Sequence, residues 1–112
     1  MWWSLGYVEV TTSGSPVRAT VNAPDPAELL PSHSVLFQQV SGNTGKVYVC
    51  SGSSADKDTG EGVVAVLATP STNVLPSAAV TITNALNAIN VADFWLDADT
   101  SGDKVLVSYV QA

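Results

Sequence analysis

Residues 34–51 read SVLFQQVSGNTGKVYVCS, and this stretch sets the fold class that we expect for the chain. Two runs rich in strand-forming residues, Ser34–Val40 and Lys46–Ser51, flank the connection Ser41–Gly45. β-Branched and aromatic residues favour strands, and glycine-containing connections of this length are common between paired strands. The stretch therefore predicts an antiparallel hairpin.

The same alternation of short strand-like runs and turn residues extends over the rest of the 112-residue chain. Further strands are expected at Leu5–Thr12, Val17–Asn22, Val63–Thr69, Ala78–Thr83, Phe94–Ala98 and Lys104–Gln111. The last two, joined by Asp99–Asp103, form a second predicted hairpin. One helical turn is expected at Ala27–Leu30, and Asn84–Asp93 fits either a short helix or an irregular crossing. About seven or eight antiparallel strands predict an all-β fold in one domain over residues 1–112, a β-sandwich or a jelly-roll-like barrel.

Composition argues against two classes of partner. The formal net charge is −6, and the four basic residues are scattered along the chain as Arg18, Lys46, Lys57 and Lys104. Binding to nucleic acid needs clustered cations that neutralise phosphates, so no nucleic-acid partner is expected. No apolar run approaches the roughly 20 residues of a membrane-spanning helix, so no membrane partner is expected either.

The N-terminus and the single cysteine bear on where the chain folds. MWWSLGYVEV has no basic region followed by a long apolar run, so it is not predicted to be a signal peptide. Cys50 cannot form an internal disulfide, which favours synthesis and folding in a reducing cytoplasm. In a strand of alternating valines, Cys50 is expected to be a small buried hydrophobe.

Groups for catalysis are scarce in this sequence. The only histidine, His33, lies in a predicted turn, Pro31–Ser34, where we expect an exposed loop side chain. A catalytic histidine needs a nucleophile and an orienting acid, and the neighbouring serines do not by themselves create that geometry. We therefore expect no enzyme, no catalytic residue and no cofactor.

Two acidic loops have part of the pattern of a calcium site. Asp97–Gly102 has the opening D-x-D-x-S-G of a calcium loop, but its twelfth position is Ser108 rather than Glu. Asp56–Glu61 is a similar partial match with Lys57 in its middle. Asp, Ser and Gly also serve turn geometry, which is the preferred interpretation. No metal site is predicted, and metal binding by the Asp97–Asp103 or Asp56–Glu61 loop stays open.

The aromatic pair Trp2-Trp3 permits two interpretations. The two rings cap the core of their own domain, or residues 1–6 form an extended docking arm that buries them on a neighbouring subunit. Large aromatic side chains are costly to leave in water and are favoured anchors at interfaces, so both interpretations have a physical basis.

Three segments together resemble small virion structural proteins of tailed bacteriophages. The segments are VLFQQVSGNTGKVYVCSG at 35–52, VLPSAAVTITN at 74–84 and FWLDADTSGDKVLVSYV at 94–110. The resemblance runs from about Val35 to Tyr109, a span of roughly two-thirds of the chain. Two departures stand out, since Cys50-Ser51 replaces the usual Gly after the VYV strand and Ser77 replaces Gly before the next one.

The resemblance implies a capsid decoration (cement) protein on the outer surface of a virion, made in the host cytoplasm. It implies the major capsid protein as partner and a homo-oligomer, with a trimer favoured. The contacts that we expect, in the N-terminal strand and in the Ala23–Pro31 loop, are Trp2, Trp3, Tyr7, Pro24, Pro26, Leu29 and Leu30. The alternative is a fibre, neck or tail module that binds a receptor or carbohydrate, with Tyr48, Trp95 or Tyr109 as stacking platforms if these are exposed.

Overall fold

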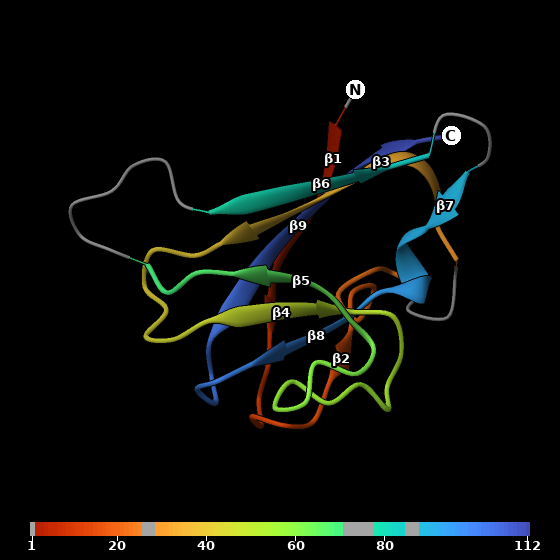
Figure 1. Cartoon of the computed structure of the whole chain (residues 1–112). Helices are drawn as coiled ribbons and strands as arrows, with labels where there is room; N and C mark the ends of the chain where they lie inside the picture. Colours follow the sequence, from red (N-terminus) through yellow and green to blue (C-terminus); the bar gives the residue numbers. More distant parts are fainter. Residues whose placement is uncertain (1, 26–28, 71–77, 85–87) are drawn as a thin grey trace.

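The strands of the chain form two layers (Figure 1). The computed structural model describes residues 2–25, 29–70, 78–84 and 88–112. These residues form β1 (Trp2–Glu9), β2 (Val17–Arg18), β3 (Pro31–Gln39), β4 (Val47–Cys50), β5 (Val63–Leu67), β6 (Ala79–Thr83), β7 (Ile89–Asn90), the 3₁₀ turn η1 (Val91–Asp93), β8 (Trp95–Ala98) and β9 (Lys104–Gln111). The first sheet has the order β1-β9-β3-β6, with β7 paired beside β3, and the second has the order β2-β8-β4-β5. All pairings are antiparallel.

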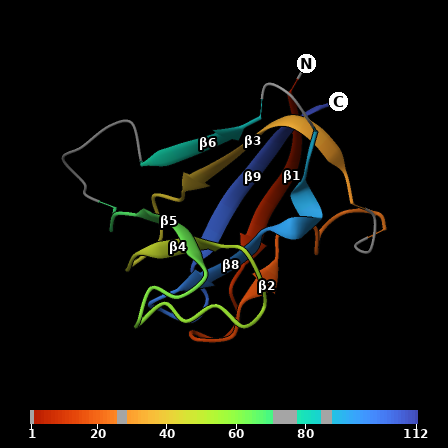
Figure 2. The ribbon, with the colours of Figure 1, turned by 45° about the vertical axis from the view of Figure 1, so that its right-hand side comes forward.

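The core lies between the two layers (Figure 2). Alternation along the strands turns one set of apolar side chains inward from each sheet, which gives two faces that bury each other. The fully buried members include Val8, Val35, Phe37, Val47, Val49, Leu96, Val105 and Val107. The Phe37 and Phe94 rings meet edge to face, with centroids 5.3 Å apart. The predicted all-β sandwich is confirmed. No helix among the described residues has the length and hydropathy to cross a membrane.

Both predicted hairpins are wrong. β3 belongs to the first sheet and β4 to the second, and the same separation divides β9 from β8. The connections 40–46 and 99–103 therefore cross from one layer to the other instead of joining neighbouring strands. The pairing partners are distant in sequence, since β9 lies between β1 and β3 while β8 lies between β2 and β4.

Polar contacts between the two connections explain why they cross. The buried Gln39 side chain donates to the carbonyls of Gly45 (3.1 Å) and Ala68 (2.9 Å), which fixes the exit from β3. Asn43 then bonds to the Lys104 backbone in both directions, its Nδ2 donating to the carbonyl (2.6 Å) and its Oδ1 accepting from the amide (2.8 Å). Asn43, in the first connection, thus satisfies both backbone groups of Lys104, where the second connection enters β9, at one end of the sandwich.

Several element boundaries differ from expectation. β1 begins at Trp2 rather than Leu5, because Trp2 and Trp3 pair with Val110 and Tyr109 of β9. The second strand ends at Arg18 instead of Asn22, since residues beyond it form turns.

The helical turn, the loop and the short helix or crossing that we expected between β2 and β3 and after β6 differ from what the structure shows. Leu30 has a φ of +52°, which is not helical, while 26–28 lie outside the described residues. The Pro31–Ser34 segment is strand rather than turn, so His33 is exposed on β3 and not in a loop. Of Asn84–Asp93, residues 85–87 are not described, and the last five form β7 and η1.

Candidate docking surface

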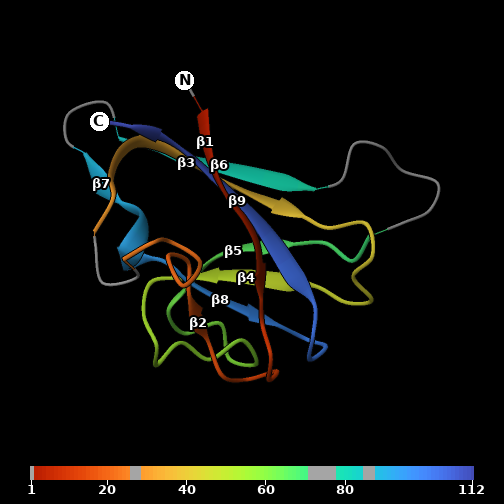
Figure 3. The same ribbon diagram turned by 180° about the vertical axis from the view of Figure 1, so that it is seen from behind.

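Strand β1 is one of the edge strands of the first sheet and runs beside β9 (Figure 3). The pairing with β9 shows on which face of the sheet each β1 side chain lies, because residues directly opposite each other point to the same face. Val8 and its partner Val105 are buried in the core, so Tyr7 and its partner Leu106 point outward. The same parity along β9 turns Trp2 outward beside Val110.

The outward positions of the first sheet are uncharged except at one end, where Glu9 of β1 lies opposite Lys104 of β9. Following the register from β1 to β6, the uncharged outward residues are Trp2, Ser4, Tyr7, Val110, Ser108, Leu106, Ser34, Leu36, Gln38, Thr83, Thr81 and Ala79. Apolar and neutral polar side chains are mixed over this part of the face.

Three aromatic side chains at β1 remain in contact with solvent. Trp2 is 50% exposed, Trp3 51% and Tyr7 59%. Trp3 shares the inner side of the sheet with Tyr109 but does not belong to the core cluster. The interpretation in which the tryptophans cap the core is therefore wrong for this domain. The segment 2–6 is extended, as an arm would be, but it is hydrogen-bonded into the sheet rather than detached.

The loop after β2 lies against the free edge of β1. Asn22 Nδ2 donates to the carbonyls of Tyr7 (2.8 Å) and Leu5 (3.4 Å). Leu5 is the extra residue of a β-bulge, and the Gly6 amide donates to Ser4 Oγ at 3.0 Å within it. The two regions predicted to make contacts, the N-terminal strand and the loop that leads to Pro31, are thus neighbours in space.

The expected contact residues of that loop differ in accessibility. Pro24 and Leu29 are exposed, while Pro26 lies outside the described residues. Leu30 packs against the domain's own core, and its carbonyl accepts hydrogen bonds from Val91 N (3.2 Å) and Ser32 Oγ (2.9 Å). Leu29 and Pro24 can reach a partner as the loop stands, whereas the Leu30 side chain is engaged within the domain.

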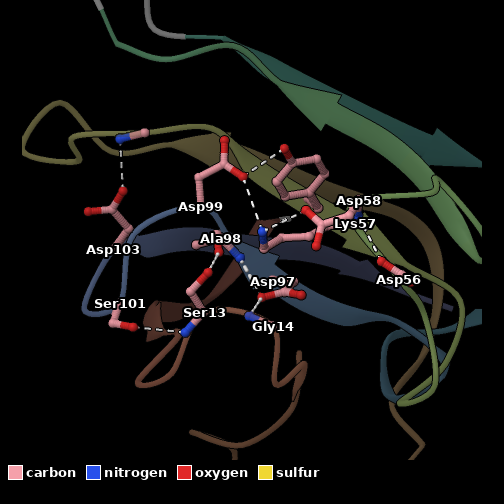
Figure 4. A network of polar contacts seen from close by, with 12 residues as sticks. Ser13, Gly14, Asp56, Lys57, Asp58, Asp97, Ala98, Asp99, Ser101 and Asp103 are labelled. Carbon is pink, nitrogen blue, oxygen red and sulfur yellow. Dashed lines mark hydrogen bonds and ion pairs between the residues drawn. The ribbon is translucent and has the colours of Figure 1, made fainter.

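The two acidic loops meet at the second sheet (Figure 4). Asp97 is buried and its Oδ1 accepts from Gly14 N (2.9 Å) and from Ala98 N (2.8 Å). Asp56 Oδ1 accepts from Asp58 N at 2.9 Å within its own turn. These carboxylates hold backbone amides, which is the role that the turn interpretation assigned to them.

A lysine supplies the positive charge between the loops. Lys57 Nζ lies 3.2 Å from Asp58 Oδ1 and 3.5 Å from Asp99 Oδ1, and the Tyr48 hydroxyl donates to Asp99 at 2.9 Å. The hydrogen bond to Asp58 raises the pKa of Lys57, while burial and then the Asp99 hydrogen bond raise the pKa of Tyr48. In the described part of the chain, no three His, Cys, Asp or Glu side chains gather as a metal site would need.

The remaining candidate groups are placed as follows. Cys50 is buried, as expected, and burial followed by the nearby Asp97 charge raises its thiol pKa to about 11. His33 shares a shallow pocket with Ser34, Thr83 and Asn84, a set without a carboxylate to orient the imidazole. The arrangement around each group thus offers no pairing of nucleophile and base within the described residues.

The predicted stacking platforms are largely covered. Tyr48 is buried, Tyr109 is half-buried against the core, and Trp95 lies under the Arg18 guanidinium, 4.9 Å from the ring centroid. Sequence reasoning did not identify Asn22, Leu36 or Leu106 as part of the surface at β1. Alternation along the strands places Leu36 and Leu106 on the same outer face as Tyr7, but only when the order of the strands is known.

Comparison with known proteins does not identify the chain: no family profile, no curated protein and no solved structure matches it.

Proposed function

We propose that this chain is a virion structural protein of the decoration type, which binds the outer surface of a bacteriophage capsid through β1 and the outer face of the first sheet. The observation that carries the proposal is the half-exposure of Trp2, Trp3 and Tyr7 on a strand that is already paired. Aromatic residues are the preferred anchors of protein interfaces. A strand held in a sheet also loses less conformational freedom on binding than a free arm.

The distribution of charge supports this orientation. The outer face of the first sheet carries only the oppositely charged pair Glu9 and Lys104, at one end, whereas Asp56, Asp58 and Asp99 lie exposed beside the second sheet. The uncharged part of this face can be buried without removing a charge from water, so its desolvation cost is low. The acidic side would then remain in solvent, away from the shell.

Binding in this mode would stabilise the capsid by simple linkage. A protein that binds the assembled shell better than its free subunits shifts the equilibrium toward the shell. The partner in the proposal is the major capsid protein. The trimer that the phage resemblance implies stays a prediction.

Co-sedimentation tests the proposal. The probe is an undecorated shell assembled from the major capsid protein of the virus that carries this chain. Trp2→Ser/Tyr7→Ser removes two outer-face anchors, and Ser53→Ala/Ser54→Ala is the matched control in an exposed loop of the second sheet. The aromatic variant is expected to bind at least about tenfold more weakly, since an interface hot spot contributes about 2 kcal/mol or more. The control is expected to bind like the wild type.

Two results would overturn the proposal. Equal sedimentation of the wild type and the aromatic variant would remove the docking role of β1. Retention of the wild type on a glycan array, lost in the same variant and without any binding to shells, would replace capsid binding by carbohydrate binding through the same rings, because exposed aromatic rings also bind sugars by stacking.

A further inference from the structure

Strand β5 is the outer strand of the second sheet, and its sequence is VVAVL. β4 pairs with it on one side, and no strand of the described residues pairs with it on the other. Val64 and Val66 are 52% and 51% exposed. Proline, charge and inward-pointing polar groups, the usual means of protecting an edge strand, are absent from β5 itself.

The free edges of β1 and β5 differ in their hydrogen bonds to side chains. At β1, the Asn22 side chain occupies the carbonyls of Leu5 and Tyr7 on the free edge. At β5, the hydrogen bonds among the described residues give no such side-chain partner to 63–67. An edge that presents unpaired backbone groups beside apolar side chains is suited to adding another strand.

We propose that β5 pairs antiparallel with β5 of a second copy of this chain, about a two-fold axis at Ala65. In this register Val64 lies opposite Val66 of the partner copy, and Val63 lies opposite Leu67. Each exposed valine thereby gains a cross-strand valine, and a two-fold interface of this kind is self-complementary. The two second sheets would become one continuous sheet.

The charges near β5 permit pairing with a second copy in spite of the net charge of −6. None of the residues of β5 itself is charged, and Glu61, the nearest acid before it, bridges to Asp56 in the preceding turn, so no like charges face each other within the paired strands. Like charges directly opposite would have opposed the pairing. The interface uses the second sheet, so it is independent of the docking proposed for the first.

Molar mass in solution tests the pairing. Light scattering on the purified chain, from micromolar to millimolar concentration, is expected to approach twice the chain mass of 11.6 kDa. Val64→Lys is expected to give the monomer mass, and Val21→Lys, an exposed valine outside β5, is expected to leave the dimer intact. A monomeric wild type over the whole range, a trimer, or a dimer that survives Val64→Lys with a native circular dichroism spectrum would overturn the proposal.

Disulfide trapping tests the register. Residues opposite each other are close enough for a disulfide, whereas residues offset by two positions on antiparallel partners lie beyond about 7 Å and cannot be bridged. An oxidised mixture of Val64→Cys and Val66→Cys chains is expected to give a cross-linked heterodimer at least tenfold faster than either variant alone. Equal cross-linking by Val64→Cys alone would place the axis elsewhere and overturn the proposed pairing.

Discussion

The Asp103 carboxylate, from the connection between β8 and β9, accepts the backbone amide of Gly45, from the connection between β3 and β4, at 3.0 Å. The same carboxylate accepts the amide of Thr44 at 3.2 Å. Fifty-eight residues separate Asp103 from Gly45 in the chain, yet they lie together at one end of the sandwich. This contact joins the two segments where the chain crosses between the sheets.

Replacing Asp103 by Ala should destabilise the fold. Asp103 is buried, and its loss leaves the Thr44 and Gly45 amides without their acceptor, which costs about 1–3 kcal/mol. Urea unfolding followed by circular dichroism measures the change, with the exposed acid Asp93→Ala as control. Equal midpoints for the two variants would contradict the assigned role of Asp103.

Adding a methyl group at Gly45 should also destabilise. A Cβ there would lie 3.0 Å from Thr100 Oγ1 and 3.2 Å from Asp99 Cβ, so these side chains must shift by a few tenths of an ångström. We expect Gly45→Ala to cost about 1–3 kcal/mol, the range for overpacked sites. Gly42→Ala, with no atom within 4 Å of the added carbon, is the matched control. A Gly45→Ala variant as stable as Gly42→Ala would show that these side chains shift without cost.

Stability should fall in alkaline solution. The pKa values of Cys50, Tyr48 and Lys57 are all raised in the folded state, so their contributions are present below the unfolded values and lost as the pH rises through the folded ones. For Cys50 this interval runs from 9.0 to about 11. The measurement is the urea midpoint as a function of pH. Cys50→Ala should flatten the decline in that interval, and an unchanged slope would contradict the assignment to the thiol.

Asn22→Ala should loosen the free edge of β1. The substitution removes the donors to the Tyr7 and Leu5 carbonyls, a loss of about 0.5–1.5 kcal/mol for an ordinary hydrogen bond. Hydrogen exchange should become faster in β1 while the exchange rates of β4 and β8 stay unchanged. Uniform acceleration over both sheets would indicate global destabilisation, and no acceleration would show that Asn22 does not hold the edge.

Strand positions and inward faces were predictable because both are local properties. Val80 and Ile82 face the core while Thr81 and Thr83 are exposed, as their alternation indicated. Along β4 all four residues are buried, so the burial of Cys50 does not follow from alternation. The neighbours of each strand were not predictable, because a five-residue connection fits either a hairpin or a crossing. The burial of Gln39 and Asp103, which distinguishes the two cases, depends on contacts with distant residues.

By itself, the sequence determined an all-β chain with short alternating strands, few charges and a pair of tryptophans at the N-terminus, since propensity and period-two patterning act over a few residues. Only the tertiary structure decided that the stretch at 34–51 crosses between sheets instead of forming a hairpin. It also decided that Tyr7 and Leu106 share the outer face of the first sheet, and that the Asn22 side chain bonds to the free edge of β1. The physical reason is that antiparallel pairing is chosen by the burial of two whole faces and by hydrogen bonds between distant segments, which no local pattern encodes.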